Sequence, residues 1–164
     1  SAASDVYKRQ ALDWLDLNQD DHVLDLFCGM GNFTLPLAKR VKSAVGIEGV
    51  FDMVKKAQLN AQFNHIENVE FYQADLDQAF SEQPWEKQHF NKILLDPPRS
   101  GAAFALNALC EIGAESILYV SCNPATLVRD AEILRSFGYR IIKTAMIDMF
   151  PYTSHLESVT LFIK

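Results

Sequence analysis

Three side chains suited to nucleophilic or acid–base chemistry lie at the ends of predicted strands. Asp96 and Cys122 each follow a short apolar run, and Glu157 stands near the start of another. A thiolate can attack an electrophilic carbon and a carboxylate can accept a proton, which together would allow covalent catalysis. Parallel neighbouring strands end at one edge of a sheet, whereas a final strand brings its start to that edge only if it is antiparallel. An antiparallel final strand would therefore place Glu157 beside Cys122.

Cys122 has two possible interpretations. A free cysteine is commonly a small buried apolar residue, which is how we interpret Cys110. Cys122, however, is followed by Asn123 and Pro124, and proline is favoured in the first turn of a helix. The amino end of a helix favours a thiolate. We therefore interpret Cys122 as a nucleophile.

The segment that begins at Asp96 is stiffened by Pro97 and Pro98. Asp96 could cap the following helix, although capping does not require two prolines. An aromatic residue after such a segment would favour methylation of an amino nitrogen, but Arg99 stands there instead. Glu157 could also be an ordinary surface acid, and His155 is expected to be a loop residue without a role.

A glycine turn after the first predicted strand indicates a nucleotide-sized crevice. The apolar run 23–26 breaks into Gly29-x-Gly31 before a predicted helix, and bare glycine backbone lets a ligand approach closely. The second predicted strand ends in Glu48, whose carboxylate can accept both hydroxyls of a ribose. Thr34 occupies the place of the third glycine in the dinucleotide pattern. This departure disfavours a pyrophosphate ligand and favours a nucleoside without phosphates, such as S-adenosylmethionine.

Asp75 follows the third predicted strand and has two interpretations of equal weight. At the carboxyl edge of the sheet it could meet an adenine or its amino group. It could equally be a helix N-cap for the segment that follows it.

The alternation of apolar runs with helical periodicity predicts an α/β fold. Five strand–helix units are followed by two consecutive strands, which is typical of the class I methyltransferase variant of the Rossmann-like fold. We expect a doubly wound, mostly parallel sheet of seven strands with a C-terminal antiparallel hairpin. The predicted helices cover residues 11–15, 33–38, 51–63, 102–112 and 125–137, and the predicted strands cover residues 23–26, 43–47, 69–72, 92–95, 116–120, 139–147 and 156–163.

Length and composition indicate one domain with a full core. The chain has 164 residues, 49% of them apolar, and a net charge of −6 from 15 basic and 21 acidic residues. No apolar run approaches the ~20 residues of a membrane span. The three cysteines form no C-x-x-C pair, which argues against zinc and disulfides and favours a reducing, cytoplasmic setting. An acidic domain is a poor sole binder of nucleic acid.

We expect residues 1–10 to be a non-native leader and residues 11–164 to form the catalytic domain.

Several motifs in order resemble the RNA uracil-C5 methyltransferase family, most closely the bacterial enzymes that act on large-subunit ribosomal RNA. These motifs are residues 26–33, 96–99, 119–124, 149–151 and 155–158.

The resemblance implies a methyl donor, S-adenosylmethionine, and an RNA substrate presenting a flipped or single-stranded uridine. It makes Cys122 the nucleophile and Glu157 the base, with no metal. It also implies an N-terminal RNA-binding barrel, often with an iron–sulfur cluster, a central domain and a donor-site glutamine outside this chain. The donor site implied by the resemblance consists of Phe27, Gly29, Gly31, Asn32, Glu48, Asp75 and Asp96.

Two other functions stay open from the residues alone. One is methylation of an amino group on nucleic acid or protein, which would not need Cys122. The other is donor binding without methyl transfer in the absence of an RNA-binding domain. A cysteine hydrolase is disfavoured, because no histidine is obviously placed to activate Cys122.

Overall fold

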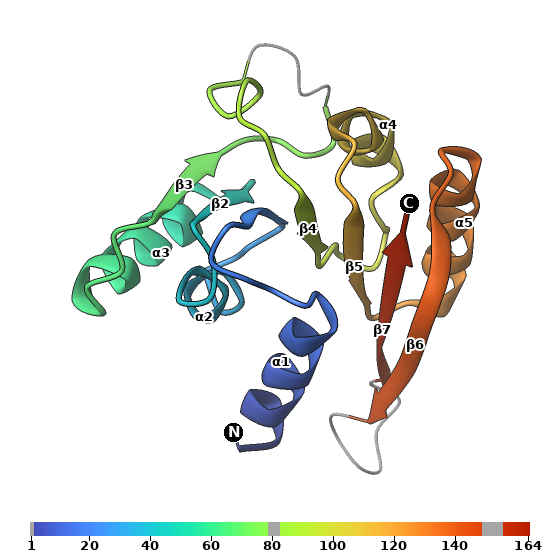
Figure 1. The fold of residues 1–164 in the computed structure, drawn as a ribbon, viewed down its shortest axis with the longest axis horizontal. Helices are drawn as coiled ribbons and strands as arrows, with labels where there is room; N and C mark the ends of the chain where they lie inside the picture. Colours follow the sequence, from blue (N-terminus) through green and yellow to red (C-terminus); the bar gives the residue numbers. More distant parts are fainter. Residues whose placement is uncertain (1, 79–82, 149–155) are drawn as a thin grey trace.

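The structure, a computed structural model, describes residues 2–78, 83–148 and 156–164. In these ranges seven strands form one sheet in the order β3-β2-β1-β4-β5-β7-β6 (Figure 1). β1 to β5 run parallel, and β7 runs antiparallel to both of its neighbours, β5 and β6. The predicted fold class and the antiparallel last strand are confirmed. The strands are β1 His22–Leu26, β2 Ser43–Glu48, β3 Val69–Gln73, β4 Lys92–Leu95, β5 Ser116–Ser121, β6 Arg140–Asp148 and β7 Leu156–Ile163.

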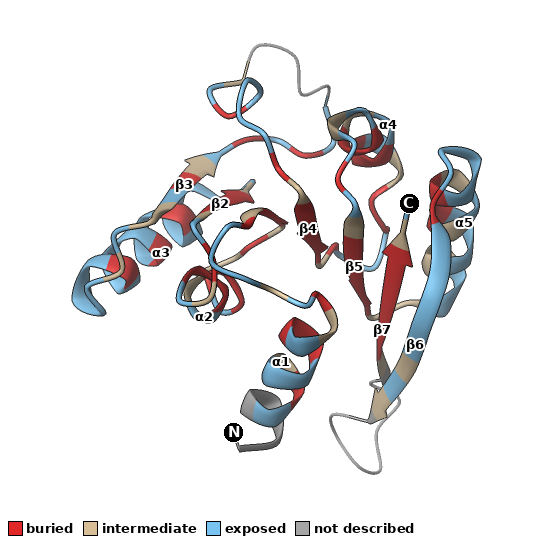
Figure 2. Cartoon of the chain, in the orientation of Figure 1, coloured by how far each residue is buried: buried red, intermediate tan, exposed pale blue. Residues whose placement is uncertain are grey.

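Helices cover both faces of the sheet because alternate residues of its central strands point to opposite sides. In β4, Ile93 and Leu95 pack into the cluster that includes α4 and α5, whereas Leu94 packs into the cluster that includes α1 and α2. The central strands are accordingly buried on both faces, while the edge strand β6 is largely exposed (Figure 2). The helices are α1 Ala2–Trp14, α2 Thr34–Ala38, α3 Phe51–Phe63, α4 Ala103–Ile112 and α5 Pro124–Ser136.

The N-terminal helix extends well beyond the predicted 11–15. α1 begins at Ala2, and the side chain of Tyr7 is buried with its ring edge-on to Phe33, the centroids 6.3 Å apart. The residues expected to be a leader therefore include a turn that packs on the domain. That they are non-native stays a prediction.

The hairpin of β6 and β7 determines which residues reach the carboxyl edge of the sheet. β7 pairs with β5 from Ser116–Ile163 to Ser121–Ser158. One step further, Cys122 follows Ser121 while Glu157 precedes Ser158. The register thus brings both residues to the same edge from strands of opposite direction.

Candidate active site

Cys122 lies between β5 and α5, where the sequence predicts the start of a helix. Pro124 occupies the first turn of α5, and the Asn123 side chain accepts a hydrogen bond of 3.1 Å from the Ala125 N–H. This is a favourable amino-terminal cap, because the first backbone N–H groups of a helix lack helical partners. Cys122 is partly exposed, whereas Cys28 and Cys110 are buried. Of the three thiols, Cys122 is therefore the one open to a substrate.

The start of α5 was expected to favour the thiolate of Cys122, but the pKa of this thiol is raised and not lowered. Burial and the neighbouring Glu157 carboxylate raise the pKa of Cys122, and Asp96 adds to this effect. The charge of Arg99 and a backbone hydrogen bond lower the pKa, but they do not outweigh the first two. The acidity of this thiol therefore depends on the charged groups gathered around it.

Glu157 is half-buried near the start of β7, and burial raises its pKa. A carboxylate with a raised pKa is a stronger base than an exposed one. In the described ranges its carboxylate makes no ion pair or hydrogen bond. His155 and the motif residues Met149, Phe150 and Pro151 lie outside the described residues.

Asp96 stands at the end of β4, where its backbone N–H donates to the Leu26 carbonyl over 3.3 Å. Burial raises the pKa of Asp96 to about 7, and the Glu157 carboxylate contributes to the rise. The capping interpretation of Asp96 is wrong, because α4 begins after Ala102 and has no side-chain cap. Its carboxyl group is thus available to a ligand.

The predicted crevice joins the glycine turn to the end of β2. Gly29 and Gly31 have φ angles of +56° and +88°, in the left-handed region that glycine adopts without strain. Phe27 also has a positive φ, +61°. The carboxylate of Glu48 accepts hydrogen bonds from the Gly29 N–H (3.2 Å) and the Val50 N–H (2.8 Å). Glu48 is therefore fixed against the turn, where a ribose could meet it.

Two buried polar residues beneath the turn were not predicted to matter. The Thr34 hydroxyl donates to the Asp25 carboxylate over 2.6 Å, and both side chains are buried. Burial raises the pKa of Asp25 to about 8, against the opposing effect of this hydrogen bond. Thr34 thus has a specific partner at the position of the third glycine. An aspartate inside the apolar run 23–26 was the available signal in the sequence.

Asp75 and Asn32 are both exposed at the same edge of the sheet. Asp75 accepts hydrogen bonds from the Asp77 N–H (3.0 Å) and the Gln78 side-chain amide (3.1 Å), so it caps the turn after β3. In the described residues that follow, up to Gln78, the chain forms a turn and no helix, so the prediction of a helix N-cap is not confirmed, and a contact with adenine stays a prediction. Asn32 lies between Gly31 and α2, and its role in donor binding also stays a prediction.

A hollow of about 600 Å³ lies away from these residues, between residues 77–78 and 85–90 on one side and α4 on the other. It contains none of the predicted site residues and no cysteine, so its chemistry is not that of the strand ends. Among the residues that the structure describes, no group of three His, Cys, Asp or Glu side chains could hold a metal ion. No helix in the described ranges is long and apolar enough for a transmembrane span.

Comparison with known proteins gives consistent matches. The family model described as tRNA (Uracil-5-)-methyltransferase matches residues 6–164. The chain is 96% identical over 154 residues to the 23S rRNA (uracil(1939)-C(5))-methyltransferase RlmD of Haemophilus parainfluenzae, covering 94% of the chain and 35% of that protein. It is 76% identical over 162 residues to the enzyme of the same name from Haemophilus influenzae, covering 99% and 37%. The chain thus spans little more than a third of the curated relatives that it matches.

Solved structures also match the chain. The Pyrococcus abyssi tRNA (uracil-54, C5)-methyltransferase in complex with S-adenosyl-L-homocysteine is 29% identical, with a TM-score of 0.78 over 94% of this chain and 37% of that one. The Synechocystis magnesium protoporphyrin IX methyltransferase with bound SAM is 18% identical, with a TM-score of 0.75 over 99% and 80%. At that identity the second match shows the shared fold alone.

Proposed function

The chain belongs to the tRNA (Uracil-5-)-methyltransferase family, and from this premise we propose that it methylates C5 of a uridine in RNA as the catalytic part of an intact enzyme. The names of the two Haemophilus relatives favour ribosomal RNA as the substrate. The observation that carries the proposal is the placement of Cys122 and Glu157 at one edge of the sheet by antiparallel pairing of β5 with β7.

The residues at the glycine turn fit S-adenosylmethionine as the methyl donor. Gly29 and Gly31 expose backbone, Glu48 offers carboxylate oxygens to ribose hydroxyls, and Asp96 can face a positively charged group. When bound, the donor supplies an electrophilic methyl group on a positively charged sulfur. Phe27, Asn32 and Asp75 complete the proposed donor site.

The chemistry requires one nucleophile and one base, because C5 of uracil reacts weakly with a methyl sulfonium. In the proposed reaction the deprotonated Cys122 thiolate bonds to C6, and the electrons of the C5=C6 bond move toward C4 as an enolate. C5 then forms its bond to the methyl carbon, while the electrons of the broken carbon–sulfur bond stay on the donor sulfur. The first attack on C6 requires access to the face of the uracil ring, and therefore an unstacked or flipped nucleotide.

Glu157 completes the proposed cycle by accepting the proton that C5 still carries. The electron pair left on C5 rebuilds the C5=C6 double bond and expels the Cys122 thiolate. The raised pKa of Glu157 suits this step, because it strengthens the carboxylate as a base. Nucleophile and base thus act on different atoms of one ring.

The test uses the intact Haemophilus parainfluenzae relative, with substitutions at the equivalent positions. Cys122→Ala should abolish methyl transfer to RNA while donor binding, measured by calorimetry, stays near that of the parent. Retained turnover would contradict covalent catalysis and would favour methylation of an amino group. Glu157→Gln should allow attack but slow proton removal, so that a covalent protein–RNA species accumulates. Absence of that species with a reactive Cys122 would remove Glu157 from the role of base.

A further inference from the structure

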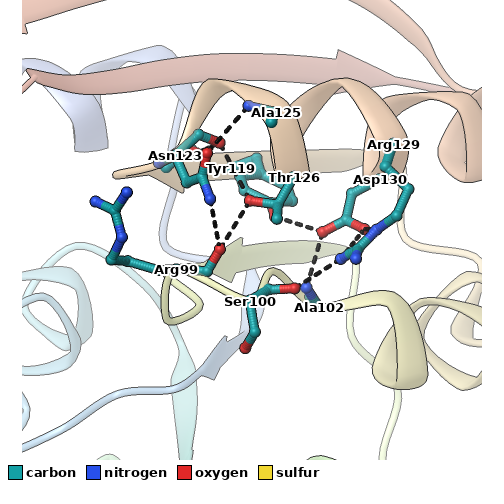
Figure 3. Close-up of polar contacts among 10 residues, drawn as sticks. Arg99, Ser100, Ala102, Tyr119, Asn123, Ala125, Thr126, Arg129 and Asp130 are labelled. Carbon is teal, nitrogen blue, oxygen red and sulfur yellow. Dashed lines mark hydrogen bonds and ion pairs between the residues drawn. The ribbon is translucent and has the colours of Figure 1, made fainter.

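The first turns of α5 hold the 97–102 loop, the connection between β4 and α4 (Figure 3). The Asn123 side-chain amide donates to the Arg99 carbonyl over 3.0 Å. The Thr126 hydroxyl lies 3.1 Å from the carbonyl oxygens of both Arg99 and Asn123, which share its proton. The backbone that carries Arg99 is therefore tied to the helix that follows Cys122.

A second set of bonds, one turn further along α5, involves Asp130, whose side chain is fully buried. One carboxylate oxygen accepts from the Ala102 N–H (2.8 Å) and the Tyr119 hydroxyl (2.5 Å). The other accepts from two nitrogens of Arg129, both at 3.1 Å. Arg129 also donates to the Ser100 carbonyl over 2.7 Å, so this set of bonds secures the far end of the loop (Figure 3).

The loop lies so close to α5 that it has no room for a side chain at Gly101. A Cβ atom there would lie 2.4 Å from a guanidinium nitrogen of Arg129 and 2.7 Å from an oxygen of Asp130. The φ angle of Gly101 is +79°, in the region that favours glycine. Both the conformation and the contact therefore require glycine.

Burial of a carboxylate is costly, even when it is as well paired as that of Asp130. Such groups are weak evidence for stability, but they can hold one conformation against alternatives. The conformation held here joins two segments of the candidate site. Asp96 and Arg99 belong to the segment after β4, and Cys122 belongs to the segment after β5.

The charged groups that act on Cys122 come from both of these segments and from β7. Glu157 and Asp96 raise the pKa of Cys122, and Arg99 lowers it. The position of Arg99 therefore matters for the reactivity of the thiol, and that position depends on the bonds from α5.

We propose that Thr126 and Asp130 are positioning residues: they hold the 97–102 loop against α5, so that Arg99 and Asp96 stay beside the end of β5 that carries Cys122. The inference depends on the proposed function only for its effect on turnover. Its effect on the thiol can be measured without RNA or donor.

The test measures alkylation of Cys122 by iodoacetamide as a function of pH, resolved by peptide mass spectrometry. Cys28 and Cys110 are buried and serve as internal references. Thr126→Val removes the hydroxyl but keeps the shape, so Arg99 should move and the pKa of the thiol should rise. An increase of about half a pKa unit would slow alkylation at pH 7 about threefold. Thr126→Ser keeps the hydroxyl and should restore the parent rate.

Asp130→Asn should slow the alkylation of Cys122 at pH 7 further, about tenfold, because it disturbs hydrogen bonds from four donor groups at once. The matched control is Glu132→Gln on the same helix; Glu132 is exposed and pairs with Arg135 at 3.4 Å. Melting temperatures show whether each variant folds. If Asp130→Asn fails to fold, Thr126→Val decides.

The proposal is overturned if Thr126→Val and Asp130→Asn lower the melting temperature yet leave the pH profile of alkylation unchanged. That result would give these residues a purely structural role. In the intact Haemophilus parainfluenzae relative, the equivalent Thr126→Val substitution should lower kcat with little change in KM for RNA. If methyl transfer survives Cys122→Ala, the proposed covalent catalysis is contradicted. The pH profile of Cys122 alkylation still shows, independently, whether Thr126 and Asp130 position the 97–102 loop.

Discussion

The two edges of the sheet use acidic residues in opposite ways, although the same strand connects them. Lys92 begins β4 and Asp96 follows it. At the amino edge the Lys92 ammonium donates to the Asp21 carboxylate (2.9 Å) and to the Asp16 carbonyl (2.6 Å), and the Asn91 amide donates to the other oxygen of Asp21 (2.5 Å). The buried charges of Asp21 and Lys92 thus partner each other.

At the carboxyl edge, Asp25, Asp96 and Glu157 form no ion pair within the described parts of the chain. Burial raises the pKa of each of these carboxyl groups, whereas hydrogen bonds from Lys92, Asn18 and Asn91 outweigh burial and lower the pKa of Asp21. The amino edge therefore uses charge for stability, and the carboxyl edge holds acids whose protonated form is favoured by burial. The difference predicts opposite responses to substitution and to pH.

Lys92→Met should give the largest effect on stability. It leaves the Asp21 carboxylate buried without its cation, at a cost of about 3 kcal/mol in the free energy of unfolding. Urea denaturation at pH 7 measures the loss. A loss below about 1 kcal/mol would mean that the amino edge is not held by this ion pair.

Asp25→Asn should have the opposite sign. The native pKa of Asp25 is raised to about 8, so ionisation costs stability progressively as pH rises from the unfolded pKa, near 4, to the native one. An asparagine cannot ionise, and its carbonyl can still accept from Thr34. We expect a gain on the order of 2 kcal/mol at pH 8 and little gain near pH 4. Equal effects at both pH values would contradict the raised pKa.

The pH dependence of Asp21 should mirror that of Asp25. Its lowered pKa gives stability that is present above the unfolded value, near 4, and is lost as pH falls through the native pKa. Asp21→Asn should therefore flatten the acid limb of the stability curve without changing the slope between pH 5 and pH 8. Thermal melts that extend from pH 8 down into the acid limb, below about pH 4, separate the two aspartates.

Glu48→Gln tests the carboxyl edge through ligand binding. If the carboxylate accepts the ribose hydroxyls, its neutralisation should weaken the affinity for S-adenosylmethionine about tenfold, or about 1.4 kcal/mol. Isothermal titration calorimetry measures the change, and Glu115→Gln, at an exposed position, is the control. Unchanged affinity would remove Glu48 from the donor site.

Arg40→Ala should have the smallest effect. Arg40 and Asp13 form an exposed ion pair at 2.7 Å, and such pairs contribute less than about 1 kcal/mol. Urea denaturation alongside Lys92→Met gives a matched comparison of an exposed pair with a buried one. Equal losses would show that burial does not set the strength of these pairs.

The fold and the placement of Cys122 and Glu157 at one edge of the sheet were predictable, because they follow from local patterns and strand direction. Two consecutive strands after α5 leave no helix for a parallel crossover, so the last strand had to return antiparallel. Element ends differ from prediction by a residue or so, except at α1, whose first turns were assigned to a leader.

The polar networks were not predictable, because their partners are distant in sequence. Asp130 looks like a solvent-facing residue of a helix until Tyr119 and Ala102 are brought against it. Asp25 likewise looks like an interruption of an apolar strand. The pKa of Cys122 was predicted in the wrong direction because the helix start was considered without Glu157 and burial.

The most direct test of the account is to trap the covalent adduct. The intact Haemophilus parainfluenzae relative would be incubated with S-adenosylmethionine and RNA in which 5-fluorouridine replaces uridine. Fluorine at C5 cannot leave as a proton does, so the reaction should stop after methyl transfer with the enzyme still attached. We predict an adduct that mass spectrometry maps to the cysteine equivalent to Cys122. Methylated RNA without an adduct, or an adduct on another residue, would contradict the account.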